Sequence, residues 1–324
     1  MTRIPSPPAP GDAADRGGRR RTIAVRLVLG PCLGGGAAAL LAWDHVAHHR
    51  LGMTLLIAAA TGFALRELAA LARGRGFHVS GGLAVPLAVL LILSQAANRF
   101  RVFGAAGLQP IDDLLGILDA QAGPLLLWCA AGVALLAGLV LAPGRRTPAD
   151  LGMTALGVLY VWGPMALFFE LMPRYRPDEA GTAVVWILVA SNKVSDSAAY
   201  LAGTFFGRHP MAPRVSPKKT WEGAVVGLVA GSAAGVGAMA LAMPAGWVPG
   251  AGAVVFSSLC AAAGQLGDLA ESAVKRWADV KDSAFLLPQF GGVLDMIDGF
   301  LVSVPVAYLF LRCGGEAWLF AGVP

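Results

Sequence analysis

Long apolar segments recur along this chain at a length that suits a lipid bilayer. Each is close to the roughly 20 residues that an α-helix needs to cross the hydrocarbon core. Hydrophobic residues make up 56% of the 324 residues and charged residues only 14%, which is more apolar than a soluble domain requires. We therefore predict an all-α polytopic integral membrane protein with about nine transmembrane helices. The predicted spans are 22–43, 52–72, 81–97, 122–142, 151–171, 181–203, 222–243, 248–267 and 292–312.

The segments between these spans divide the positive charge unequally. If the amino terminus lies inside the cell, the inner segments carry 17 Lys and Arg residues and the outer segments carry six. The positive-inside rule favours this orientation. It also places two polar loops, 204–221 and 268–291, together on the cytoplasmic face. We thus predict a multi-pass protein of the cell membrane whose active site, if it has one, faces the cytoplasm.

The net charge and the cysteines argue against several other classes of protein. The net charge of +5 follows this topology and does not indicate a nucleic-acid partner. The four cysteines are scattered, one per apolar segment, so neither a zinc site nor a disulfide framework is indicated. Within the span 52–72, the adjacent Arg66 and Glu67 are interpreted as an intramembrane ion pair, with a structural role near the site as the alternative.

The first polar segment that could carry chemistry runs from Asp268 to Asp298, between two apolar runs. After a break at Pro288, Asp295 and Asp298 are three residues apart and point the same way on a helix. Carboxylates with interposed Lys and Arg suit a divalent metal and phosphate oxygens. The alternative is that these charges only pair with one another. Before the break, four polar residues share one helix face: Asp268, Glu271, Lys275 and Asp279.

The second polar segment covers residues 190–223. Lys193 and Asp196 stand one helical turn apart inside an apolar run, where mutual neutralisation is the simplest interpretation. A basic loop follows, and a new helix is expected to begin near Thr220. The amides at that helix start, with Lys218 and Lys219 beside them, would form an anion site. Attraction to acidic lipid would also explain these lysines.

The sequence from Ser272 to Asp298 resembles the signature of the phosphatidate cytidylyltransferase (CDP-diacylglycerol synthase) family. That signature runs S-x-x-K-R-x4-K-D, then a small residue, a Pro/Gly turn, H-G-G and D-R-x-D. A second stretch, D-x-x-A-Y…G-R…S-P-K-K-T-W-E-G from Asp196 to Gly223, also resembles the family. Two positions depart from the pattern, with Phe290 in place of His and Met296 in place of Arg. The matching residues of the first stretch are Ser272, Lys275, Arg276, Lys281, Asp282, Ala284, Pro288, Gly291, Gly292, Asp295 and Asp298.

The resemblance implies the reaction of CTP with phosphatidate to give CDP-diacylglycerol and pyrophosphate, with one or two Mg²⁺ ions as cofactor. It implies Asp268 and Asp295 as the principal metal ligands, supported by Asp282 and Asp298. The implied catalytic residues are Asp268, Lys275, Asp295 and Asp298. The implied substrate-binding residues are Asp196, Ser216, Lys218, Lys219, Thr220, Arg276 and Lys281. Because the reaction brings two anions together, positioning and charge neutralisation would supply most of the catalysis.

Three regions follow from these assignments. Residues 1–21 are expected to be a disordered basic cytoplasmic tail, 22–175 a set of amino-terminal membrane helices, and 176–324 a carboxyl-terminal catalytic membrane domain. The bilayer is the expected surrounding, and a homodimer is left open. Two alternative functions remain: another CTP-dependent lipid transferase or kinase, and an ion-coupled transporter. The transporter would use intramembrane charges as its ion path, namely Lys193, Asp196, Asp295 and Asp298.

Overall fold

In a computed structural model, the described residues are mostly α-helical and include one short β-hairpin. The expected tail 1–21 and the expected spans 22–43 and 122–142 lie outside the described residues. The structure describes residues 50–79, 81–100, 109–111, 147–171, 179–243, 248–280 and 292–320.

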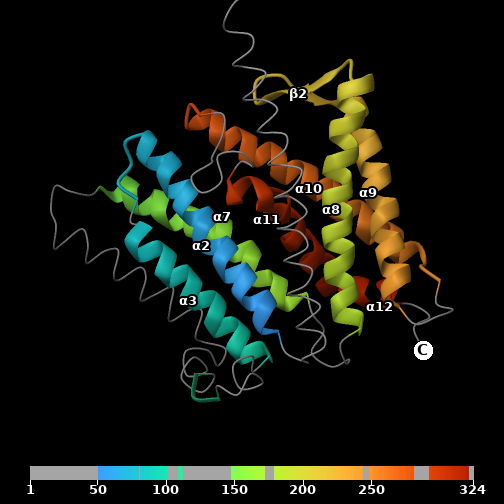
Figure 1. The fold of residues 1–324 in the computed structure, drawn as a ribbon, viewed down its shortest axis with the longest axis horizontal. Coiled ribbons are helices and arrows are strands. Elements are labelled where there is room, and N and C mark those ends of the chain that lie inside the picture. The colour runs from blue at the N-terminus through green and yellow to red at the C-terminus, as the bar shows by residue number, and fades with distance from the viewer. Residues whose placement is uncertain are drawn as a thin grey trace, which may run out of the picture.

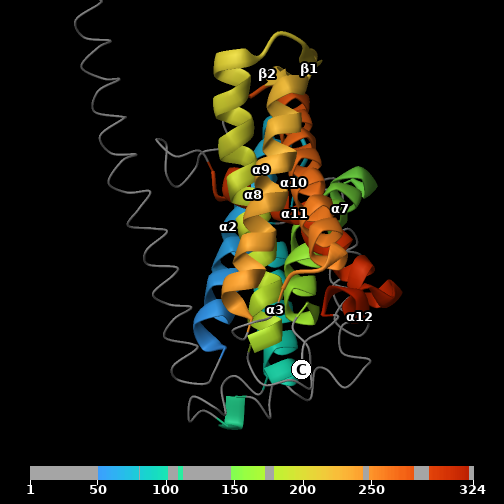
Figure 2. The same ribbon diagram turned by 90° about the vertical axis from the view of Figure 1, so that its right-hand side faces the viewer.

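The long helices form two groups joined by α11 (Figure 1). One group consists of α2 (Leu51–Gly74), α3 (Gly81–Phe100) and α7 (Pro148–Glu170). The other consists of α8 (Glu179–Phe206), α9 (Trp221–Ala242) and α10 (Ala251–Trp277). Helices α8 and α9 run side by side in Figure 1 and in Figure 2, and α10 crosses them obliquely in Figure 1. Helix α11 (Val293–Phe310) contacts both groups and continues into η1 (Leu311–Gly315) and α12 (Glu316–Leu319).

Five helices in the described part of the chain are long and apolar enough to cross a membrane. They are α2, α7, α9, α10 and the run Val293–Leu319. Helices α3 and α8 are not among these five. The apolar stretch of α3 is shorter, Ala84–Ala97, and α8 carries Lys193 and Asp196 in its interior. The protein is thus an all-α membrane protein, as predicted. Five of the nine expected spans are candidates among the described residues.

Local sequence explains where α7 and α9 begin. Thr147 precedes α7, and its hydroxyl accepts from the Asp150 amide at 3.3 Å, while Asp150 Oδ2 accepts from the Thr147 amide at 2.7 Å. This reciprocal pair is a capping box. At α9, the Thr220 hydroxyl accepts from the Gly223 amide at 3.2 Å, so the predicted helix start near Thr220 is confirmed.

A stripe of glycines joins α8 to α9. Gly223, Gly227, Gly231 and Gly235 recur every fourth residue along α9 and are buried. A Cβ at Gly227 would lie 2.8 Å from the carbonyl oxygen of Ser195 on α8, which is closer than real contacts allow. Small residues at such spacing let two membrane helices pack backbone against backbone. The hairpin that connects these helices is therefore held at one end of a rigid pair.

That end of the molecule also gathers the other loops that the charge pattern assigned to one face. The hairpin pairs β1 (Pro210–Ala212) with β2 (Ser216–Thr220) in antiparallel fashion. Arg276, near the end of α10, donates through Nε to the Val215 carbonyl at 3.1 Å. Arg75, after α2, forms a 2.9 Å ion pair with Asp279, and the His78 amide donates to Asp150 at 2.7 Å. Loops far apart in sequence thus meet at this end.

Candidate active site

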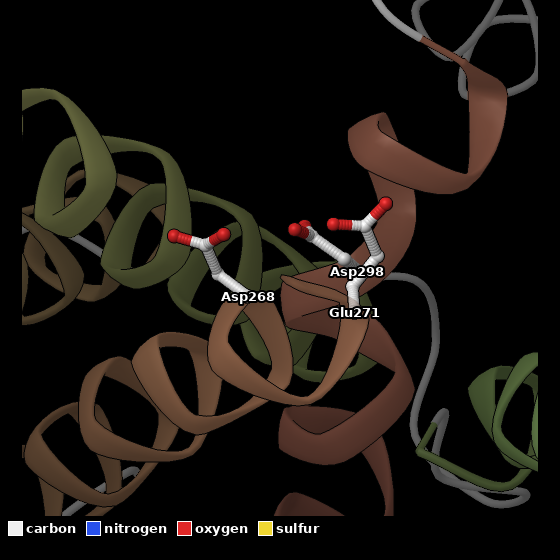
Figure 3. Close-up of side chains that lie close together, drawn as sticks. All are labelled: Asp268, Glu271 and Asp298. Atoms are coloured by element: carbon white, nitrogen blue, oxygen red, sulfur yellow. The ribbon is translucent and has the colours of Figure 1, made fainter. Parts of the chain in front are cut away.

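Three carboxylates meet where α10 and α11 cross. Asp268 and Glu271 lie one turn apart on α10, and Asp298 lies in the second turn of α11. One oxygen of each lies within 4.8 Å of an oxygen of each of the others. All three side chains point to the same side of the crossing (Figure 3). Glu271 and Asp298 are buried and Asp268 is partly exposed, so this carboxylate cluster is open on one side.

Glycine at position 267 permits this close crossing. A Cβ at Gly267 would fall against the backbone carbonyl oxygen of Asp298 and 2.9 Å from the Cα of Gly299. One turn earlier, Gly264 faces the buried side chain of Asn192 on α8 in the same way. Because backbone atoms of the neighbouring helix cannot be displaced as a flexible side chain can, only glycine fits at position 267.

Two lysines contact the carboxylates. Lys219 reaches from β2 and lies 2.5 Å from Asp268 Oδ2. This ion pair joins the two polar segments that are separate in sequence. Lys275 lies one turn after Glu271 and bridges two helices, with its Nζ 2.7 Å from Glu271 Oε2 and 2.9 Å from Asp295 Oδ1. Ammonium groups placed in this way could also receive phosphate oxygens.

Asp295 holds the start of α11. Its second oxygen, Oδ2, accepts from the Gly292 amide at 2.9 Å, which closes the first turn of the helix. A buried side chain from α2 also caps this end: Glu67 accepts from the amides of Val293 at 3.0 Å and Leu294 at 2.8 Å. A carboxylate at a helix amino terminus is favoured by the helix dipole. Glu67 therefore positions the helix that carries Asp298.

Helix α8 contributes a third lysine beside the cluster. Lys193 donates to the Met296 carbonyl at 2.9 Å and lies 4.9 Å from the centre of the Phe300 ring. It is 3.9 Å from Asp196, so the predicted pairing within α8 is a loose one. Met296 is one of the two residues that depart from the family pattern. Its backbone, rather than its exposed side chain, makes the described contact at this position.

The other predicted site residues lie in the hairpin, on α10 or outside the described part. Ser216 begins β2, and Lys218 is exposed on it. The hydroxyl of Thr220 caps α9, and Arg276 holds the hairpin through the Val215 carbonyl. The candidates that lie outside the described residues are Lys281, Asp282 and Phe290.

The donor set fits a divalent cation. Glu271 Oε1 is buried and has no hydrogen-bond donor among the described residues, and such an orphaned oxygen is costly unless a cation or donor satisfies it. Oxygen donors are those that Mg²⁺ prefers. Among the described residues, five carboxylates and three lysines lie at this crossing. The carboxylates are Asp196, Asp268, Glu271, Asp295 and Asp298, and the lysines are Lys193, Lys219 and Lys275.

Sequence reasoning did not identify the role of Glu271 or the partner of Glu67. Glu271 was placed on the polar face of its helix but was not assigned a role, although it lies three residues from Asp268. Glu67 was interpreted as a pair with Arg66, with a structural role near the site as the alternative. Its contact with the start of α11 has no local signal, because the partners are more than two hundred residues apart. The structure brings together Asp268 and Asp298 of the predicted metal set.

These features define a helical membrane protein with a cluster of carboxylates and lysines where α10 and α11 cross. The chain matches the model of the cytidylyltransferase family over residues 25–314, and it belongs to that family. It is 40% identical over 212 residues to the phosphatidate cytidylyltransferase of Brucella suis biovar 1 (strain 1330), which covers 65% of this chain and 73% of that protein. It is 33% identical over 250 residues to the phosphatidate cytidylyltransferase of Mycobacterium bovis, which covers 70% of this chain and 78% of that protein.

Proposed function

We infer that this chain is a membrane-bound nucleotidyltransferase that converts CTP and phosphatidate into CDP-diacylglycerol and pyrophosphate, a step of phospholipid synthesis. The observation that carries this inference is the contact between Lys219 of the hairpin and Asp268 of α10, at 2.5 Å. It joins the two segments that resemble the family, which supports a single site formed by both. The similarity to phosphatidate cytidylyltransferases over most of the chain supports the same substrates.

The reaction joins two anions, and the lysines of the site suit that task. A phosphate oxygen of phosphatidate attacks the α-phosphorus of CTP, a new P–O bond forms, and the bond to the β-phosphate breaks with release of pyrophosphate. The attacking phosphate is already ionised, so no general base is required. In our proposal Lys219 and Lys275 hold phosphate oxygens as charge shifts toward the leaving group. Lys218 and Arg276 stand beside them on the hairpin side.

We propose that Asp268, Glu271 and Asp298 hold Mg²⁺, with room for a second ion left open. When bound, the ion would neutralise phosphate oxygens and stabilise the charge that develops on them. Asp295 was expected to be a principal ligand and stays a candidate. Its contacts with Lys275 and the Gly292 amide support a different role, in which it orients the lysine and the first turn of α11.

An assay of purified protein tests the proposed function. With CTP and Mg²⁺ present, we expect pyrophosphate release only when phosphatidate is added, and we expect CDP-diacylglycerol to form in equal amount. The matched arms replace phosphatidate by a polyprenyl phosphate, by diacylglycerol or by lipid without a phosphomonoester. Release that depends on polyprenyl phosphate but not on phosphatidate would contradict the assignment and favour a different lipid transferase. Release of CDP with phosphorylation of diacylglycerol would indicate a kinase.

We also propose the finer topology that the charge pattern predicts. It has about nine spans in the cell membrane, with the hairpin and the carboxylate cluster on the cytoplasmic face. Residues 176–324 would hold the catalytic residues. Residues 22–175 would support them, as the contact of Glu67 with α11 illustrates.

Cysteine labelling in intact cells tests this orientation. Arg214 is exposed in the hairpin turn and Cys313 is exposed in η1, at the other end of α11. In protein lacking the other native cysteines, an impermeant thiol reagent should label Cys313 but not an Arg214→Cys variant of Cys313→Ala protein. After lysis both should react. Labelling of the hairpin cysteine in intact cells would reverse the assigned orientation.

A further inference from the structure

A hollow lies between α2 and α3, away from the carboxylate cluster. Its volume is about 370 Å³, within the usual range for a ligand pocket. Helix α2 lines it with Arg66, Ala70 and Arg73, whose spacing of four and three residues places them on one helix face. Glu67, the residue that caps α11, points to a different face of the same helix. The hollow is therefore distinct from the carboxylate cluster, and α2 connects the two only through Glu67, which caps the helix that carries Asp298.

The hollow carries positive charge that the described residues do not neutralise. Arg66 and Arg73 are both exposed, and neither has a carboxylate partner among the described residues. No Asp or Glu is among the residues that line the hollow. The Arg73 guanidinium lies over the start of α3, with Nη1 3.6 Å from the position of a Cβ on Gly81. Two guanidinium groups beside a helix amino terminus form a strong site for a phosphate group.

Apolar residues also line the hollow. They are Val85 and Pro86 of α3 and Ala69 of α2. A free phosphate would leave these residues uncovered, whereas a phospholipid would cover them with its glycerol and acyl chains. The hollow also lies at the end of α2 where Arg75 pairs with Asp279, beside the loops that gather at one end of the helices. Lipid headgroups lie at this depth of a membrane-spanning helix.

We propose that this hollow binds the phosphate of an anionic membrane phospholipid through Arg66 and Arg73, as a lipid site separate from the catalytic one. Such a lipid would fasten α2 to α3. Glu67 of α2 caps α11, the helix that carries Asp298. A lipid that stabilises the position of α2 would therefore also stabilise the position of α11. This site does not depend on which lipid phosphate the carboxylate cluster converts.

Binding of phosphatidylglycerol to the purified full-length protein, without CTP or divalent metal, tests the proposal. Phosphatidylglycerol has no terminal phosphate group and so is not a substrate of the proposed reaction. We expect the double variant Arg66→Gln/Arg73→Gln to bind it at least about tenfold more weakly, because both charge-assisted contacts are lost. The matched control, Arg214→Gln, removes an exposed arginine of the hairpin and should change the affinity less than about threefold.

A second variant distinguishes loss of the lipid site from a folding defect in the double variant. Gly82 lines the hollow, and a Cβ at this position meets no atom within 4 Å, so Gly82→Phe is designed to place a ring in the hollow while both arginines stay. We expect the same loss of binding, with an unchanged unfolding temperature in the absence of lipid. Wild-type affinity in either variant would overturn the site. Displacement of the lipid by an equal concentration of inorganic phosphate would assign the hollow to free phosphate instead and would also overturn the proposal.

Discussion

The substitution Asp298→Asn should lower the turnover of CTP by at least about two orders of magnitude while the protein stays folded and membrane-inserted. Asp298 is buried in the carboxylate cluster, and its Oδ1 accepts from the Gly299 amide at 2.6 Å. Asparagine can keep this hydrogen bond but carries no charge for a cation. Asp268→Asn should have a similar effect. The double variant should be little worse than either single one, because residues that serve one metal act as a unit.

The control for this prediction is Asp279→Asn. Asp279 follows α10 and is exposed, and its ion pair with Arg75 at 2.9 Å lies on the surface, where such pairs contribute little. Its positive φ of 56° is one that asparagine accepts readily. Turnover should stay within a factor of about two of wild type, since no catalytic contact is removed. Near-normal turnover of Asp298→Asn, or an equal loss in Asp279→Asn, would contradict the assignment of the cluster.

The second large effect is expected at the crossing of α10 and α11. Gly267→Ala adds a methyl group that must push against the Asp298 backbone, so the two helices must separate. Overpacking of this kind typically costs about 1–3 kcal/mol. We expect a lower unfolding temperature and a loss of turnover of about tenfold or more, because a small displacement of positioned groups costs that much.

The control for Gly267→Ala is the same substitution at a glycine where an added Cβ meets no other atom. At Gly237 of α9 an added Cβ meets no atom within 4 Å, so Gly237→Ala should leave turnover unchanged and should stabilise the helix slightly if anything. Wild-type turnover and stability in Gly267→Ala would show that the two helices tolerate a wider crossing. The geometry of the cluster would then not depend on the glycine.

Local patterns in the sequence predicted the helices and their starts. Apolar periodicity and length are properties of each segment alone, so α2, α7, α9 and α10 could be predicted without knowledge of their neighbours. The start of α9 near Thr220 could be predicted because a hydroxyl side chain favours the position that caps a helix. The loop charges correctly placed the hairpin and the end of α10 together, since the positive-inside rule acts on every loop in the same way.

The detailed partners of the polar residues could not be predicted in this way. Asp295 and Asp298 have the same spacing as a metal-binding pair, but Asp295 contacts Lys275 and the Gly292 amide. Which of these roles Asp295 takes depends on how α11 is rotated about its own axis relative to α10. Tertiary packing determines that rotation. The contact of Glu67 with Val293 likewise exists only because α2 packs against α11. The spacing of residues in the sequence does not predict either contact.

Titration of the purified protein with Mn²⁺, followed by electron paramagnetic resonance, tests most directly whether the carboxylate cluster is the metal site. The account predicts at least one bound ion in wild-type protein and in Asp279→Asn. It predicts affinity weakened by about tenfold or more in Asp298→Asn and in Glu271→Gln, since each loses a ligand charge. Asp295→Asn should keep more of its affinity, because its carboxylate contacts Lys275 and a backbone amide. Wild-type affinity in Asp298→Asn and Glu271→Gln, with binding abolished in Asp295→Asn, would contradict the account.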